Sequence, residues 1–171
     1  MSNTGQLSWL KLSVLALILD QASKYWAEHI LGWGSRIDVL PVFDLSLAHN
    51  TGAAFGFLAD AGGWQQVFFA TLATVVSLAL AVAMSRLLSH QRHLAVAYAL
   101  IISGAIGNLI DRLIYQYVVD FIHVFYGDYH FPHFNIADSA IFIGAVLLIA
   151  EAFNWPFLDT KLDTDTGQKT Q

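Results

Sequence analysis

The sequence predicts a mainly α-helical membrane protein with four transmembrane helices and a small extracytoplasmic β-structured element. Of its 171 residues, 56% are hydrophobic and only 12% are charged, whereas about a quarter of the residues in an average soluble domain are charged. Several apolar runs reach the roughly 20 residues that a helix needs to cross a bilayer. The basic residues lie mostly at one predicted side of the membrane, which sets the orientation of the chain.

The predicted helices differ in how many charges interrupt them. The second and third, about residues 61–88 and 93–113, contain long stretches without Asp, Glu, Lys or Arg. After Asp138, the fourth helix, about residues 138–158, carries a single acid, Glu151, near its far end. Length and composition therefore predict that these three segments span the bilayer.

The first predicted helix, about residues 9–30, is the most polar of the four. Its charged residues are Lys11, Asp20, Lys24 and Glu28. Both lysines are long enough to extend toward the lipid headgroups. A cleaved signal peptide is the alternative for this segment, but Asp20 interrupts the apolar run and no small-residue cleavage pattern follows it.

The distribution of basic residues predicts that both termini are cytoplasmic. Five of them lie near the termini or in the connection between the second and third helices: Lys11, Arg86, Arg92, Lys161 and Lys169. The two other connections, residues 36–60 and 115–134, contain only Arg36. By the positive-inside rule, these two connections are extracytoplasmic.

Residues 36–60 form the predicted β-structured element, which we expect to lie on the outer membrane surface. Pro41 excludes a continuous helix here, and the alternation at Leu45 and Leu47 leads into the turn sequence NTG. The segment is too apolar for a solvated loop, which favours contact with the membrane surface.

The rest of the chain adds structural features. Residues 1–158 are predicted to form one membrane domain, and the polar tail over residues 159–171, which lacks aromatic residues, is predicted to be disordered.

Gly104 and Gly107 in the third helix have the small-residue character that lets transmembrane helices approach closely. We therefore expect these glycines to lie at a helix–helix contact.

Helix direction places most of the unusual polar residues at the level of the outer leaflet. They are Asp20, Asn50, Asn108, Asp111, Arg112, Asp120 and Asp138. Charged groups at membrane depth are costly, so they normally pair inside the bundle or carry function. Asp111 and Arg112 also suit interfacial charges where a helix meets water. The convergence nevertheless marks a candidate functional site.

Three other charges in this group have different local interpretations. Asp138 suits the N-terminus of the fourth helix, where an acid interacts favourably with the helix dipole. Asp20 and Lys24 are four residues apart and suit an intrahelical ion pair. Asp120 is harder to explain locally, because it lies in the apolar run YVVDFIHVF of a predicted loop.

Two carboxylates at one level, Asp120 and Asp138, suit general acid–base catalysis. If they approach closely, both cannot ionise readily, and the pair titrates as a unit. The ionised member can take a proton from water while the protonated member polarises a carbonyl oxygen, as in aspartic proteases. Asn50 and Asn135 can supply neutral hydrogen bonds to such a site.

Other chemistries fit the sequence less well. The chain has no cysteine, which excludes thiolate nucleophiles and cysteine-ligated metals, and its net charge of −5 does not indicate nucleic-acid binding. The outer loop contains a group that could form a metal site: His123, His130, His133 and Asp128. No metal-ligand motif is present, so interfacial loop side chains are the favoured interpretation. Ser139 lacks a clearly placed activating base and suits a helix cap.

Five motifs occur in an informative order and spacing. They are DQASK (20–24), NTGAAF (50–55), GNLIDR (107–112), VVDF (118–121) and FNIADS (134–139). Together they resemble the bacterial lipoprotein signal peptidase family, also called signal peptidase II, over about residues 9–157. Ser103 departs from the family's more usual glycine, and the stretch GDYHFPH varies within the family.

The resemblance implies an inner-membrane aspartic endopeptidase that removes signal peptides from diacylglyceryl-modified prolipoproteins, cutting just before the lipidated cysteine. It implies a four-helix membrane domain with a small extracytoplasmic β-structured cradle, no metal or cofactor, and inhibition by the cyclic peptide globomycin. The family's catalytic aspartates correspond to Asp120 and Asp138. Active-site support corresponds to Asn50, Gly52, Asn108, Arg112 and Asn135, with structural polar support from Asp20, Lys24 and Asp111. We expect a monomer whose partners are prolipoproteins and membrane lipids.

Two other function classes stay open. A proton-coupled transporter or channel subunit would use a relay of carboxylates: Asp20, Asp111, Asp120 and Asp138. Such a relay predicts carboxylates strung through the membrane depth, whereas most of these collect at one end. A non-catalytic assembly factor predicts no penalty from replacing aspartate by asparagine.

Overall fold

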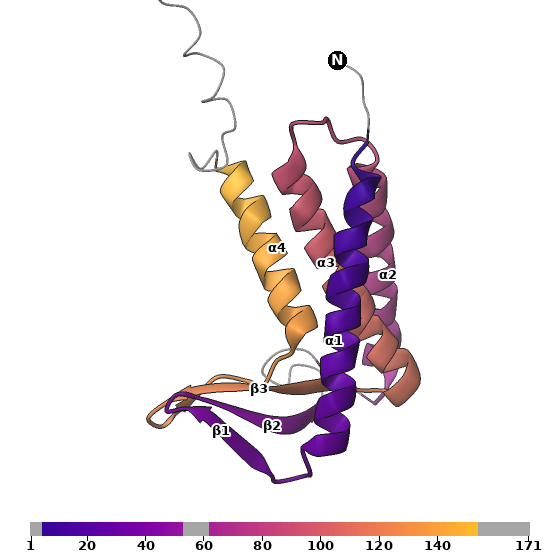
Figure 1. Ribbon diagram of the computed structural model, residues 1–171. Helices are drawn as coiled ribbons and strands as arrows, with labels where there is room; N and C mark the ends of the chain where they lie inside the picture. The colour runs from indigo at the N-terminus through magenta and orange to yellow at the C-terminus, as the bar shows by residue number, and fades with distance from the viewer. Residues whose placement is uncertain (1–4, 53–61, 154–171) are drawn as a thin grey trace, which may run out of the picture.

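Four long helices lie side by side, and a small antiparallel sheet extends from one end of them (Figure 1). The computed structural model describes residues 5–52 and 62–153. In this part of the chain the helices are α1 (Leu10–Ile30), α2 (Trp64–Met84), α3 (Arg92–Tyr115) and α4 (Ile136–Ala152), preceded by a short 3-10 helix, Leu7–Trp9. The strands are β1 (Arg36–Leu40), β2 (Phe43–Asn50), β3 (Val118–Tyr126) and β4 (Tyr129–His130).

Each helix overlaps its predicted segment, although α2 ends at Met84 and not near residue 88, and the helices differ as membrane spans. Among the described residues, α2 and α3 combine the length and the apolar composition of a span. α1 is interrupted by charges, and α4 has 17 residues, fewer than the roughly 20 that cross a bilayer. A crossing by all four helices therefore stays a prediction. The end of the predicted fourth helix and the polar tail lie outside the described residues.

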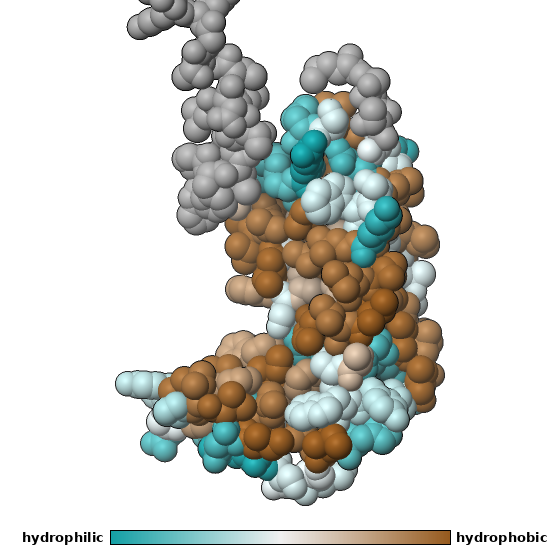
Figure 2. Space-filling view, in the orientation of Figure 1, coloured by the Kyte–Doolittle hydropathy of each residue, from teal (hydrophilic) through white to brown (hydrophobic). Residues whose placement is uncertain are grey.

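A broad band of apolar side chains covers the helices, and polar groups gather toward their two ends (Figure 2). In α2 the exposed side chains include Val67, Val75 and Leu78, which are 68%, 58% and 63% exposed. A surface of this kind is unfavourable in water but suits a bilayer, where lipid tails are as apolar as the side chains.

Glycines allow α4 to approach α3 closely. A Cβ atom at Gly104 would lie 2.2 Å from the Ala137 carbonyl oxygen, and one at Gly144 would lie 2.8 Å from the Ala97 carbonyl oxygen. A Cβ atom at Gly107 would lie 2.5 Å from Asp20 Oδ2. The predicted packing role of Gly104 and Gly107 is confirmed, and Gly107 also makes room for a buried carboxylate.

The connection between α3 and α4, predicted as a loop, instead contains strand β3. The sheet order is β1-β2-β3-β4, and β2 pairs with β3 so that Ala48 lies opposite Asp120. The predicted β element over residues 36–60 is thus part of a larger sheet, with residues 53–61 outside the described residues. The first four residues of β3 are all buried, so the strand lacks the alternation that reveals a half-buried strand in a sequence.

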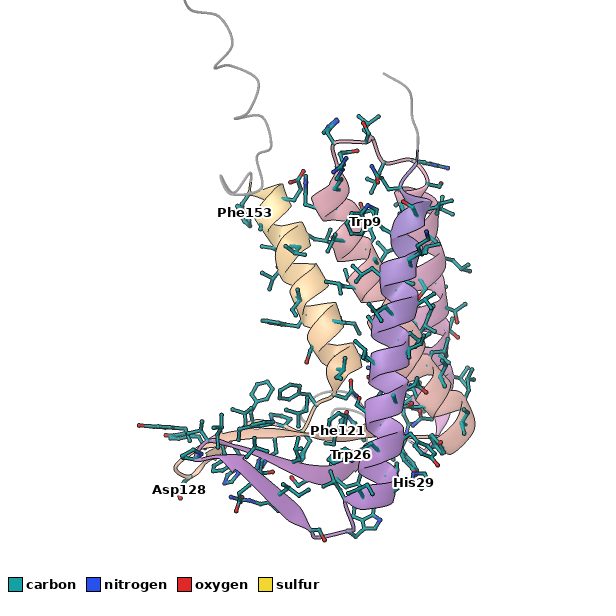
Figure 3. All side chains as sticks on the ribbon, in the orientation of Figure 1. Trp9, Trp26, His29, Phe121, Asp128 and Phe153 are labelled. Atoms are coloured by element: carbon teal, nitrogen blue, oxygen red, sulfur yellow. The ribbon has the colours of Figure 1, made fainter. Side chains whose placement is uncertain are left out.

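The junction of the sheet and the helices is apolar around the functional residues. Phe121, next to Asp120 on β3, packs against Ala27 and Leu31 at the end of α1 (Figure 3). This contact fixes the start of β3 beneath the helices. The aspartate beside Phe121 is therefore held where sheet and bundle meet.

Candidate active site

Asp120 lies near the start of β3 and is 1% exposed. Its Oδ1 accepts a hydrogen bond of 2.7 Å from Asn135 Nδ2, and its Oδ2 accepts one of 3.1 Å from Asn50 Nδ2. Both donors are neutral amides. The carboxyl group is thus fixed in position by hydrogen bonds that do not neutralise its charge.

Asp138 lies in the first turn of α4 and is partly exposed. Its Oδ2 accepts a hydrogen bond of 3.2 Å from the Asn135 backbone N–H, and its backbone N–H donates to Asn135 Oδ1 over 2.9 Å. The predicted helix-terminus role is therefore real, in the form of a capping box. Asp138 Oδ1 accepts a further hydrogen bond of 2.7 Å from Asn108 Nδ2 of α3, which a cap alone does not require.

Asn135 connects the two aspartates. Its side chain donates to Asp120 and accepts from the backbone of Asp138, while its backbone N–H donates to the Asp138 carboxylate. Because one residue bonds to both, Asp120 and Asp138 lie close together, which is the condition that paired acid–base chemistry requires. We refer to Asp120 and Asp138 as the dyad.

The surroundings favour a proton on Asp120. Burial, followed by the charge of Asp138, raises the pKa of Asp120 to about 7, although hydrogen bonds from Asn50 and Asn135 act in the opposite direction. A carboxyl group with this pKa is about half protonated at neutral pH. Asp120 can therefore act as a proton donor where an ordinary aspartate is ionised.

A second group of buried charges, which we call the brace, lies next to the dyad: Asp20, Lys24 and Asp111. Lys24 Nζ lies 2.9 Å from Asp20 Oδ2 and 2.9 Å from Asp111 Oδ2. The predicted Asp20–Lys24 pair is confirmed. The structure rules out the extension of Lys24 to the headgroups and an interfacial charge at Asp111, because these residues are 3% and 1% exposed. Charges buried to this degree need partners, and the brace supplies them.

The brace also holds the backbone beside each aspartate of the dyad. Asp20 Oδ1 accepts a hydrogen bond of 2.8 Å from the N–H of Ala137, the residue before Asp138. Asp111 Oδ2 accepts one of 3.1 Å from the N–H of Val119, the residue before Asp120. These two hydrogen bonds are how Asp20 and Asp111 can give the structural support that the family resemblance implies.

Gln21, which lies within the DQASK motif, adds a neutral member to the brace that was not predicted as a site residue. Its Nε2 donates hydrogen bonds to Asp20 Oδ2 (3.2 Å), to Asp111 Oδ1 (3.1 Å) and to the Gly107 carbonyl oxygen (3.2 Å). Its position in the sequence between Asp20 and Lys24, at the same membrane level, is the feature that could have identified it as part of this group.

Arg112, on α3, lies near the dyad. Its guanidinium donates to the Gly52 carbonyl oxygen over 3.0 Å and to the Asn108 carbonyl oxygen over 3.2 Å, and it lies 4.8 Å from the ring centroid of Phe69. Gly52 N–H in turn donates to Asn50 Oδ1 over 3.0 Å. Arg112 therefore joins α3 to the end of β2, where Asn50 contacts Asp120.

A cavity of about 750 Å³ opens beside the dyad. Its polar end includes Asp138, Asn50, Asn108 and Arg112, and its apolar walls include residues 141–143 of α4. Figure 2 shows the corresponding hollow between the helices and the sheet. Asp138 lines the cavity directly, and Asp120 contacts it through Asn50. The cavity can therefore hold an apolar ligand with one of its bonds next to the dyad.

A family model described as signal peptidase (SPase) II matches residues 12–154 of this chain. The chain belongs to the signal peptidase II family. It is 52% identical over 147 residues to the lipoprotein signal peptidase of Acinetobacter baumannii, covering 86% of this chain and 84% of that protein. It is 51% identical over 154 residues to the lipoprotein signal peptidase of Ectopseudomonas mendocina, and the match covers 89% of this chain and 91% of that protein.

Two solved structures, each described as a bacterial membrane enzyme, share the fold of this signal peptidase II family member. One aligns over 100% of both chains with a TM-score of 0.80 at 28% identity. The other covers 89% of this chain and 97% of its own, with a TM-score of 0.76 at 30% identity. The protein is therefore a membrane peptidase by family, with mainly helices and a small sheet.

Three histidines of this signal peptidase II family member were predicted to be interfacial loop side chains: His123, His130 and His133. The structure instead places His123 and His130 on strands β3 and β4. His123 is 8% exposed, and its Nδ1 lies 2.9 Å from Asp44 Oδ2. The rings of His130 and His133 lie nearly parallel to it. Asp128 lies at the far tip of the sheet (Figure 3). In the described part of the chain, no group of three acidic or histidine side chains is arranged to hold a metal ion.

Proposed function

We propose that this protein is an intramembrane aspartic endopeptidase that removes the signal peptide of diacylglyceryl-modified prolipoproteins, cutting just before the lipidated cysteine. The observation that carries the proposal is the pair of carboxyl groups held together by Asn135 at an apolar cavity. Membership of the signal peptidase II family supports the reaction class. The relatives named lipoprotein signal peptidases support the substrate class.

The environments of the two aspartates suggest their roles. Asp138 accepts hydrogen bonds from Asn108 and from a backbone N–H at a helix N-terminus, which favour the charged form. We assign it as the base that takes a proton from the attacking water. Asp120, whose pKa is raised to about 7, donates a hydrogen bond to the carbonyl oxygen of the scissile bond.

The reaction then follows from these two roles. The scissile carbonyl enters between Asn50 and Asp138, and the water oxygen bonds to its carbon as Asp138 gains a proton. The tetrahedral intermediate collapses when its C–N bond breaks and the leaving nitrogen takes that proton from Asp138. No metal or cofactor takes part. Asn135 keeps both carboxyl groups in place, and Arg112 fixes the end of β2 beside them.

The cavity and the distribution of charge suggest where the substrate lies. The apolar wall formed by α4, including Ile141, Phe142 and Ile143, suits the acyl chains of a lipidated substrate. We place the protein in the bacterial inner membrane as a monomer with four spans, both termini in the cytoplasm and the dyad near the periplasmic leaflet. In this orientation the substrate's lipid chains and the dyad share one leaflet.

The test is cleavage of a purified diacylglyceryl-modified prolipoprotein in detergent or vesicles. Asp120→Asn and Asp138→Asn should each lower kcat at least about 100-fold, because acid–base catalysis contributes about 10²–10⁴-fold, while the proteins stay folded. Asp128→Asn, at the exposed tip of the sheet, is the matched control and should cleave normally. Globomycin should block cleavage, and a chelator should not.

Two results would contradict the proposal. Full cleavage by Asp138→Asn would remove the dyad from the mechanism. Loss of wild-type cleavage in the chelator would indicate a metal-dependent reaction. An unmodified prolipoprotein, run in parallel, tests the lipid requirement separately from the chemistry.

A further inference from the structure

Three nearly parallel imidazole rings lie together, two on the sheet and one in the segment that follows it. The ring centroid of His123 lies 4.5 Å from that of His133 and 5.1 Å from that of His130, with interplanar angles of 8° in both pairs. His133, in the segment between β4 and α4, lines the cavity beside the dyad. His130 is exposed and is not part of the cavity wall. Within this group, His133 is therefore the ring placed to meet a bound substrate.

Asp44 fixes the position of one proton in this group. Its fully buried carboxylate accepts hydrogen bonds from His123 Nδ1 (2.9 Å) and Ser46 Oγ (2.8 Å), and it lies 3.2 Å from Arg36 Nε. Burial raises the pKa of Asp44, but these partners outweigh it and hold the pKa below its usual value. An ionised carboxylate only accepts hydrogen bonds, so the single hydroxyl proton of Ser46 is committed to Asp44.

The hydroxyl of Ser46 in turn fixes the tautomer of His133. Ser46 Oγ lies 2.9 Å from His133 Nε2. Because the hydroxyl proton is already donated to Asp44, the proton of this second bond belongs to Nε2. Burial, followed by the neighbouring His123, lowers the pKa of His133, so its ring is neutral at neutral pH. A neutral ring with its proton on Nε2 has Nδ1 as a hydrogen-bond acceptor.

The cavity needs an acceptor of this kind when it holds a peptide. A peptide carries one N–H per residue, and a buried N–H without an acceptor costs free energy. Asn108 and Arg112 present donors. In the proposed mechanism Asp138 receives the proton of the attacking water, and Asn50 Oδ1 already accepts a hydrogen bond from the Gly52 N–H. These polar groups of the wall are suited to the chemistry or are already engaged.

We propose that His133 is a specificity-determining residue whose Nδ1 accepts a hydrogen bond from a backbone N–H of the substrate polypeptide near the scissile bond. The inference rests on the proposed peptidase function and adds a substrate contact outside the dyad. In this role His133 needs a hydrogen-bond acceptor at Nδ1. A residue that only packs against its neighbours would need only a ring of similar size and shape.

The test uses synthetic lipopeptide substrates in which one amide at a time near the scissile bond is replaced by an ester. With the wild-type enzyme, the ester at the contacted position should raise KM about tenfold, the effect of one hydrogen bond to a buried group, with kcat nearly unchanged. His133→Phe should raise KM for the all-amide substrate by a similar factor. In this variant the same ester should have no further effect.

Three further variants sharpen the test. His133→Asn, whose Oδ1 lies near the position of Nδ1, should recover most of the affinity. Ser46→Ala, which no longer fixes the tautomer, should show a smaller ester effect than the wild type and carries the test if His133→Phe does not fold. His130→Phe is the matched control and should behave as the wild type.

The outcomes separate this inference from the function on which it rests. An unchanged KM in His133→Phe, or an ester effect equal in that variant and the wild type, would overturn the role of His133 alone. Failure of the wild-type enzyme to cleave the all-amide lipopeptide would instead overturn the proposed function.

Discussion

The dyad and the brace are neighbouring pairs of carboxylates, and only the brace has a lysine in contact with its carboxylates. In the brace, Lys24 Nζ lies 2.9 Å from a carboxylate oxygen of both Asp20 and Asp111. In the dyad, Asp120 and Asp138 receive hydrogen bonds from neutral amides of asparagine side chains and the backbone. A cation in direct contact stabilises ionised carboxylates, whereas burial with only neutral donors in contact favours a retained proton. The comparison explains why one pair suits structure and the other suits catalysis.

The largest expected effect comes from removing the lysine of the brace. Lys24→Met should lower the free energy of unfolding by about 3–5 kcal/mol, because it leaves two buried carboxylates without their cation. Thermal unfolding in detergent measures this, with Lys11→Met, at an exposed position of the same helix, as the control. An equal effect at both lysines would contradict the brace.

A second expected effect is a pH dependence of stability that comes from the dyad. The pKa of Asp120 is about 7 in the folded protein and about 3.8 when unperturbed. Between these values the folded state binds more protons, so stability falls as pH rises, by at most about 1.4 kcal/mol per pH unit for one group. Unfolding measured from pH 4.5 to 8 should show this fall in the wild type and a flatter dependence in Asp120→Asn. Identical curves would contradict the raised pKa.

The smallest expected effect comes from a neutral member of the brace. Gln21→Leu removes hydrogen bonds to Asp20 and Asp111 but keeps Lys24 in place, so it should cost only about 1 kcal/mol of stability. Cleavage should stay close to the wild-type rate. A loss as large as that of Lys24→Met would mean that the amide, rather than the charge, holds the brace together.

Much of the candidate site follows from the sequence because helix direction and a shortage of charge constrain it. In a chain with few charged residues, the polar groups at one leaflet have few partners other than each other. This reasoning brought together Asp120, Asp138, Asn50 and Asn108, and the structure places them in contact with one another or through Asn135. The order of the five motifs supports the family resemblance, and the proposed roles of these residues come from that resemblance.

The parts that sequence reasoning missed depend on contacts between distant segments. Lys24 is long enough to reach the headgroups or a buried partner, and only the position of Asp111 on α3 decides between them. Strand β3 is covered on both faces at its start, so its sequence reads as a plain apolar run. The proposed contact of His133 depends on Ser46, which lies on β2, 87 residues away in the sequence.

The hydrogen bonds from the brace to the backbone also affect when the enzyme can first act. Asp20 near the start of the chain binds the N–H of Ala137 near its end, and Asp111 binds the N–H of Val119 between them. The dyad is therefore positioned only after α4 has joined α1 and α3. By the proposed mechanism, a chain still being synthesised, with α4 not yet inserted, would be inert toward the signal peptides around it in the membrane.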